Sequence, residues 1–284
     1  MPVICPNAFA PPVANDDRGP LLSPALREQV RRLERAHSAA AAGRSAQPLG
    51  LPEIDAQLPE GGLLSGALHE IEAGPTPSGR VAPHDGAALG FASFMLGRLA
   101  AARTSAGTLL WCRQPTGTFD APPYAPALAQ WFDPARLVMV TARREEDLFW
   151  AMEEGLRCSG IAAVLGETRA ADPTAGRRLS LAAEKNGRPA LLLRSQPAPP
   201  QSVCVTRWRV ASSAAAADLG PRWRIELRRN RYGAPSVEEI PSWLVEWSDE
   251  THRLAVVPQT VGRPAGEGWS QSGLPSPIPQ RLAG

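Results

Sequence analysis

Cysteine is scarce in this sequence, and the few cysteines are far apart. Four occur in 284 residues, and no two of them form a C-x-x-C pair (Cys5, Cys112, Cys158 and Cys204). Structural zinc sites and disulfide frameworks need closer or paired spacings, so the sequence indicates neither. The four histidines are equally scattered, and the H-E-x-x-H and G-x-S-x-G motifs of metalloproteases and hydrolases are absent. We therefore expect no metal site.

Long hydrophobic runs are also missing. No apolar stretch reaches the roughly 20 residues that a membrane-spanning helix needs. The N-terminal segment lacks the basic region and the continuous apolar core of a secretory signal. We therefore expect a cytoplasmic protein that makes no contact with a membrane.

Lysine is nearly absent, since Lys185 is the only lysine among 30 basic residues. The 28 acidic residues bring the net charge down to +2, a balance that does not by itself indicate a nucleic-acid partner. Because alanine, glycine and proline are abundant, the lack of lysine is explained more simply by a GC-rich genome than by a function.

Apolar segments of strand length alternate with segments of helix length through the middle of the chain. The expected strands are 67–71, 108–113, 137–140, 161–165 and 189–194, and the expected helices are 86–102, 125–132, 145–158 and 175–186. This order predicts an α/β fold with a doubly wound, mostly parallel sheet. Segments 203–210 and 223–228 then alternate strictly, as antiparallel or edge strands do, and 243–257 predicts a terminal hairpin.

The two ends of the chain differ from this core in composition. We predict disorder in residues 1–21 and 261–284, a helix with a linker in 22–47, and a core domain in 48–260. Within the N-terminal helix, Leu26, Val30 and Leu33 form a narrow apolar stripe. This stripe either packs on the core or belongs to an arm that binds a partner, and the Ala/Gly/Ser linker behind it favours the arm.

A Gly-rich loop lies between the first core strand and the helix that follows it, the arrangement of a phosphate-binding loop. Gly74 and Gly79 keep the glycine spacing of G-x-x-x-x-G-K-[ST], with Ser78 before the second glycine. Arg80 stands in place of the phosphate-binding lysine, and Val81 in place of the hydroxyl that binds magnesium. We predict a degenerate loop that does not bind ATP.

Nucleotide hydrolysis also needs acidic groups at the ends of core strands. One such end offers Gln114, an amide that cannot act as a general base, and the other offers Gly166 followed by Glu167. Glu167 is either a displaced metal ligand or, as we expect, a solvated carboxylate at a strand end. The sequence contains no intact active site.

Arginines gather near the C-terminal end of the core. They alternate with apolar residues along one predicted strand and continue into the next turn (Arg222, Arg224, Arg228, Arg229 and Arg231). Together with Trp223 and Tyr232 they could bind DNA or an acidic partner. The alternative is a solvated edge strand whose charges prevent edge-to-edge pairing.

Taken together, these segments resemble the RecA-like superfamily and, within it, the ImuA family of damage-inducible mutagenesis proteins. The segments that carry the resemblance are 24–37, 58–71, 86–92, 109–114, 136–167, 222–233 and 243–247. It implies a RecA-like core with antiparallel edge strands on its C-terminal side, preceded by an N-terminal helix arm. Matched to the RecA motifs, Gln114 replaces the catalytic glutamate and Gly166 the Walker B aspartate, so the resemblance implies neither ATPase activity nor a cofactor.

The same resemblance implies a function in the SOS response. The chain would be a non-catalytic adaptor of an error-prone, translesion DNA synthesis complex, associated with the nucleoid when in that complex. Its partners would be an ImuB-type homologue of Y-family polymerases, RecA and, indirectly, single-stranded DNA. Two alternatives stay open: an ATP-dependent DNA-binding motor that uses Arg80 in place of lysine, and a SulA-like inhibitor of cell division.

Overall fold

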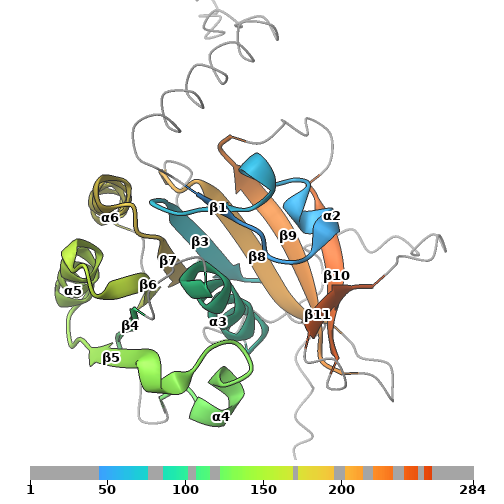
Figure 1. Ribbon diagram of the computed structural model, residues 1–284, viewed down its shortest axis with the longest axis horizontal. Helices are drawn as coiled ribbons and strands as arrows, with labels where there is room; N and C mark the ends of the chain where they lie inside the picture. The colour runs from blue at the N-terminus through green and yellow to red at the C-terminus, as the bar shows by residue number, and fades with distance from the viewer. Residues whose placement is uncertain are drawn as a thin grey trace, which may run out of the picture.

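The computed structural model of the chain is shown in Figure 1. It describes residues 45–75, 86–101, 107–115, 122–168, 172–194, 202–213, 220–232, 240–248 and 253–257. The stripe of Leu26, Val30 and Leu33, both predicted disordered ends and most of the Gly-rich loop lie outside these ranges.

A nine-stranded sheet forms the centre of the molecule. Its strands are β3 (Leu68–Ala73), β4 (Thr108–Arg113), β5 (Leu137–Thr141), β6 (Ile161–Thr168), β7 (Ala190–Arg194), β8 (Thr206–Ser213), β9 (Arg222–Asn230), β10 (Ser242–Ser248) and β11 (Arg253–Val256). They lie in the order β11-β10-β9-β8-β3-β7-β6-β4-β5. β3 to β8 run parallel to one another, and β9, β10 and β11 continue the sheet in antiparallel pairing. The predicted α/β fold with a mostly parallel sheet is confirmed.

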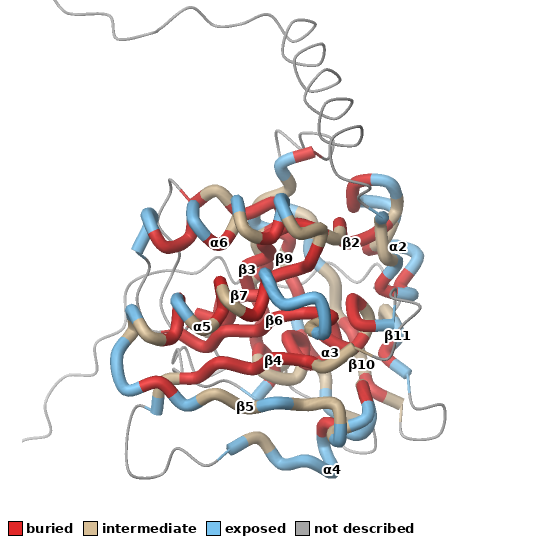
Figure 2. Tube along the Cα trace, turned by 60° about the vertical axis from the view of Figure 1, so that its left-hand side comes forward, coloured by how far each residue is buried: buried red, intermediate tan, exposed pale blue. Residues whose placement is uncertain are grey.

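Helices cover the two faces of this sheet separately. One apolar cluster joins α3 (Gly86–Ala101) and α4 (Ala125–Leu128) to one face, with Trp111 and Trp208 among its buried residues. A second cluster joins α5 (Glu145–Arg157) and α6 (Pro173–Asn186) to the other face of the parallel strands. Figure 2 shows that the buried residues concentrate on α3 and on the middle strands, whereas the outer turns of α5 and α6 are exposed. No helix in the described ranges is long and apolar enough to cross a membrane.

Local sequence signals account for the ends of α6. The carboxylate of Asp172 accepts a hydrogen bond from the Thr174 amide at 2.8 Å, as an N-cap does, and Pro173 takes the first helical position. Gly187 ends the helix in the left-handed conformation, with φ of 61°. The helix therefore begins two residues before its predicted start, where the chain offers both a cap and a proline.

Small elements precede the central sheet. β1 (Ala46–Gln47) pairs antiparallel with β2 (Leu63–Leu64), and α2 (Pro52–Asp55) and a 3-10 turn (Pro59–Gly61) lie between them. The pairing ties residues 46 and 47, which we had placed in the linker, to the core. These elements are too short to leave a periodic pattern in the sequence.

Residues 67–71 alternate apolar and polar side chains, a pattern that predicts a half-buried strand. This prediction is wrong for β3, because both of its faces are covered and His69, Glu70 and Glu72 are buried with partners. For β9 the antiparallel alternative is confirmed and the edge-strand alternative is excluded, because β9 pairs antiparallel with β8 on one side and with β10 on the other. Its arginines therefore do not serve to protect a free edge. The predicted terminal hairpin is confirmed as β10 and β11.

Candidate functional site

The Gly-rich loop connects β3 to α3, as predicted, and only its first residues are described. Ser78, Gly79, Arg80 and Val81 lie outside the described residues. The amide of Gly74 donates to the Val210 carbonyl at 2.6 Å and so extends the pairing of β3 with β8. A Cβ on Gly74 would lie 2.9 Å from the Cβ of Ala211. Close strand packing therefore already requires a glycine here, whether or not an anion binds.

The two strand ends that should carry acidic groups have structural contacts instead. Gln114 follows β4, and its side-chain amide donates to the Arg143 carbonyl at 3.0 Å, just before α5. Gly166 lies inside β6, because this strand runs three residues further than predicted. A Cβ at this glycine would lie 2.3 Å from the sulfur of Met152 in α5. Gly166 therefore faces α5, and its neighbour Glu167 faces the opposite side of the sheet.

Glu167 is a buried carboxylate near the end of β6. Its side chain is 9 % exposed, and its Oε1 accepts a hydrogen bond from the Trp111 indole at 2.5 Å. Arg113 lies directly opposite on β4, with its Nε 3.8 Å from the same oxygen. The expectation of a solvated carboxylate at a strand end is wrong, since pairing with β4 and β7 carries β6 past the predicted end and buries Glu167. We call Arg113 and Glu167 the carboxyl-edge pair.

The carboxyl-edge pair lies at the strand end where the sequence offered Glu167 as a displaced metal ligand. Mg²⁺ binds carboxylate oxygens and keeps several of its water molecules. Here the Trp111 indole donates to the carboxylate and the Arg113 guanidinium lies beside it in a buried setting, so a cation at Glu167 would meet a positive charge 3.8 Å away. No group of His, Cys, Asp and Glu in the described ranges is arranged to hold a metal ion.

A second group of charged residues crosses β7, β3 and β8 near the same end. We call it the strand ladder, and it consists of Arg194, Glu70, Arg207, Glu72 and Arg209. Glu70 is 1 % exposed and lies 3.2 Å from Arg194 and 3.1 Å from Arg207. Register places Arg207 beside Glu70 and Arg209 beside Glu72. The sequence did carry this signal, as two acids and two arginines each spaced by two residues, but only the parallel pairing shows that they meet.

Some arginines of the predicted cluster form ion pairs with acidic residues, and others do not. On β9, Arg222 lies 2.7 Å from Glu246 and Arg228 lies 3.5 Å from Glu226. Arg224 is exposed, and among the described residues it has no acidic partner. Beyond these, Arg231 lies over the Tyr232 ring at 5.4 Å, and Arg229 is half-buried opposite Arg207. Four of the five arginines thus lie on β9 and Arg231 follows it, and two of the five already have an acidic partner.

Comparison with known proteins gives one result that bears on the family. No family model matches the chain. The chain is 32% identical over 220 residues to Protein ImuA of Caulobacter vibrioides strain NA1000 / CB15N, and equally to Protein ImuA of strain ATCC 19089 / CB 15. Each alignment covers 72% of this chain and 84% of the relative.

Proposed function

Since this chain belongs to the ImuA family, we propose that it is a non-catalytic adaptor of damage-inducible mutagenesis, acting in error-prone, translesion DNA synthesis. Family membership rests on the two Caulobacter relatives, which cover most of the chain. The name of these relatives supports an accessory role in damage-inducible mutagenesis. The absence of catalysis and the binding of partners are the further steps that we propose.

The observation that carries the non-catalytic part is the carboxyl-edge pair. Glu167 lies on the face of the sheet opposite α5, and its carboxylate accepts from the Trp111 indole and lies 3.8 Å from Arg113 Nε. A magnesium ion at Glu167 would bring a second positive charge next to the buried Arg113, which is costly in a medium of low dielectric constant. With Arg80 and Val81 in the loop, these features support a RecA-like core that no longer turns over nucleotide.

The partners that we propose follow from the family. They are an ImuB-type homologue of Y-family polymerases, RecA and, through these proteins, single-stranded DNA, which would bring the chain to the nucleoid. Leu26, Val30 and Leu33 remain the predicted contact of the N-terminal arm. Among the arginines of β9, Arg224 is the one best placed for an acidic or phosphate-bearing partner, because it is exposed and not paired within the described residues.

Calorimetry with Mg-ATP, repeated with single-stranded DNA and accompanied by a phosphate-release assay, tests the non-catalytic part. We expect neither heat of binding nor phosphate release, with RecA as the positive control. Micromolar ATP binding with DNA-stimulated turnover that Arg80→Ala abolishes would overturn the proposal and establish an ATPase that uses arginine in the loop. Co-purification with the ImuB-type homologue, compared between the wild type and a Leu26→Glu/Val30→Glu variant, tests the adaptor part separately.

A further inference from the structure

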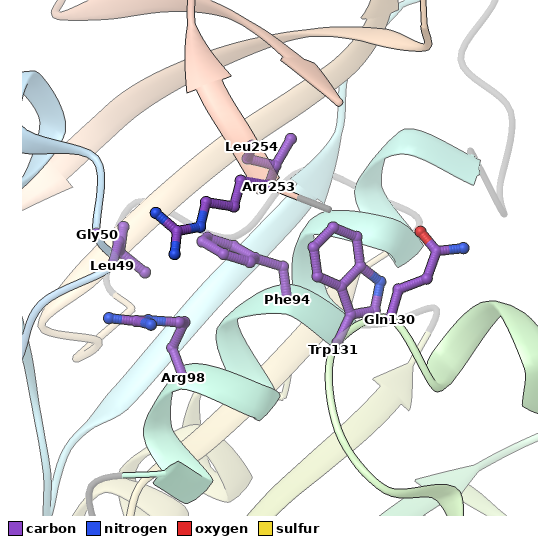
Figure 3. A pocket seen from close by; sticks show the side chains of 8 residues that line it. All are labelled: Leu49, Gly50, Phe94, Arg98, Gln130, Trp131, Arg253 and Leu254. Atoms are coloured by element: carbon purple, nitrogen blue, oxygen red, sulfur yellow. The ribbon is translucent and has the colours of Figure 1, made fainter. Parts of the chain in front are cut away.

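A pocket of about 440 Å³ lies between α3, β11 and two loop segments, away from the carboxyl-edge pair. Its lining comes from four parts of the chain that are distant in sequence: Leu49, Gly50, Phe94, Arg98, Gln130, Trp131, Arg253 and Leu254. Figure 3 shows that the guanidinium groups of Arg98 and Arg253 lie on the side of Gly50, and that Trp131 lies on the far side of Phe94. We call this the two-arginine pocket.

The described residues that line the pocket carry two positive charges, and none of them has a carboxylate. Within the described ranges neither Arg98 nor Arg253 forms an ion pair, although most arginines on the opposite face of the sheet do. Arg253 is exposed, whereas Arg98 donates from Nε and Nη2 to the Pro48 carbonyl at 3.1 and 2.8 Å. The Nη1 group of Arg98 has no hydrogen bond to the described residues, so both guanidinium groups can still donate to a ligand.

The loop segment 49–51, which lines the pocket beside the arginines, is held by hydrogen bonds to Asp55. The carboxylate of Asp55 accepts hydrogen bonds from the amides of Leu49, Gly50 and Leu51 at 2.7, 2.9 and 3.2 Å. Gly50 adopts a φ of +82°, and the ideal Cβ position at this residue is 3.4 Å from the Arg98 guanidinium. The three amides are therefore used within the protein and do not face a ligand.

The other side of the pocket is aromatic. Trp131 is half-buried and packs edge-on against Phe94, with ring centroids 5.4 Å apart, and against Trp247 at 4.7 Å. These two ring contacts hold the Trp131 indole in place. A rigid aromatic wall beside a charged one suits a ligand that has an apolar part next to an acidic part.

We propose that the two-arginine pocket binds an acidic peptide segment, with its carboxylates on Arg98 and Arg253 and an adjacent large apolar side chain against Trp131 and Phe94. The planar fork of arginine matches a carboxylate with two parallel hydrogen bonds. That this peptide belongs to a partner in mutagenesis rests on the function proposed above. The chemistry of the ligand rests on the pocket alone.

A nucleotide fits this pocket less well than a peptide. Phosphate sites are built from backbone amides, often at a helix N-terminus, that point at the anion. In the two-arginine pocket the nearby amides of residues 49–51 are bound to Asp55, and α3 contributes side chains from its middle and its last turns. The pocket thus offers side-chain donors, which favours carboxylates held by guanidinium groups.

The test uses the full-length protein and a capped peptide of sequence Ser-Glu-Glu-Leu-Phe-Ser. Calorimetry gives its affinity, and the ¹⁵N-indole signal of Trp131, assigned with Trp131→Phe, reports where it binds. We expect the Gln-Gln version of the peptide and the Arg253→Ala protein each to lower affinity about tenfold, the order expected for a lost charge-assisted hydrogen bond. Rising salt should weaken binding, since the arginines are accessible to ions.

Arg177→Ala is the matched control, because it removes an exposed arginine from α6, on the other face of the sheet, and leaves the pocket intact. Its affinity should stay within about twofold of the wild type. Equal binding of the Gln-Gln peptide, equal losses in Arg253→Ala and Arg177→Ala, or binding of AMP but not of the peptide would overturn the proposal. These measurements need no partner protein. Failure of the peptide to bind is therefore distinct from failure to co-purify with the ImuB-type homologue, which concerns the adaptor function.

Discussion

Arg113 and Arg253 show two opposite uses of the same side chain. Arg113 is 7% exposed and lies opposite Glu167 on the neighbouring strand, and the indole of Trp111 donates to that carboxylate. Arg253 is exposed on β11 and, among the described residues, faces no carboxylate. In the first case a described residue supplies the counter-charge, and in the second we propose that a ligand does.

This difference separates structural arginines from those that are available for binding. The strand ladder belongs with Arg113, since β3 supplies Glu70 and Glu72 to the arginines on both of its neighbours. In the two-arginine pocket the lining residues supply aromatic rings and amide groups but no acid. A count of arginines in the sequence therefore says little about binding until each one has been checked for a partner across the sheet.

The largest expected effect comes from breaking the carboxyl-edge pair. Arg113→Ala leaves Glu167 as a buried carboxylate that has lost its counter-charge, so we expect the free energy of unfolding to fall by about 3–5 kcal/mol. Urea denaturation followed by circular dichroism measures this change. Arg224→Ala should shift the same curve by less than about 0.5 kcal/mol, because it removes an exposed charge.

A double variant sharpens the interpretation. Arg113→Met combined with Glu167→Leu replaces both charges by apolar groups, and we expect it to be more stable than Arg113→Ala alone. If Arg113→Ala were as stable as the wild type, the contact between Arg113 and Glu167 would not contribute to the stability of the fold. The argument against a metal at Glu167 would then lose its basis.

His69 allows a second test of how burial in the core affects a titratable group. It differs from the carboxyl-edge pair because it is a buried neutral group and not part of an ion pair. Its Nε2 lies 2.9 Å from the Leu64 carbonyl and must donate to it, so its Nδ1 accepts from the Thr206 hydroxyl at 2.8 Å. The Trp208 indole in turn donates to Thr206 at 2.8 Å. Burial lowers the pKa of His69 from 6.5 to about 4, although the hydrogen bond to Leu64 acts in the other direction.

The sign of the pH effect follows from proton binding. Between pH 6.5 and pH 4 the unfolded chain binds a proton at His69 that the folded chain excludes, so stability falls as the pH falls through this window. We expect a loss of about 3 kcal/mol by pH 4 from this residue. Denaturation curves of His69→Gln and the wild type across this range isolate the contribution, because the other titrating groups are common to both. Parallel pH profiles would show that His69 is accessible to protons in the folded state.

The order and type of the core elements could be predicted from the sequence, because inner strands buried on both faces leave continuous apolar runs. The segments at 108–113, 161–165 and 189–194 form such inner strands, and 137–140 forms the parallel edge strand β5, which is partly exposed. The end of β6 could not be predicted, since glycine and glutamate are poor strand formers and only pairing with β4 and β7 extends the strand through them. As a result, Glu167 was expected in solvent.

The candidate sites were harder to predict because they depend on contacts between distant segments. Arg98 and Arg253 are separated by more than half of the chain, and no spacing in the sequence relates them. The arginines near residue 225 attracted attention because they are close in sequence, yet Glu246 on β10 and Glu226 neutralise two of them. Register across the sheet decides which charges remain available, and a single sequence does not reveal register.

The smallest expected effect distinguishes the two arginines of the pocket from each other. Arg98→Ala removes two hydrogen bonds to the Pro48 carbonyl, so we expect a loss of about 1 kcal/mol in the free energy of unfolding. Arg253→Ala should change it by less than about 0.5 kcal/mol, because Arg253 is exposed and makes no ion pair with the described residues. Urea denaturation of both variants decides this, and equal losses would mean that Arg253 also has a structural role. A residue that contributes little to folding but strongly to peptide affinity is one whose counter-charge must come from outside the chain.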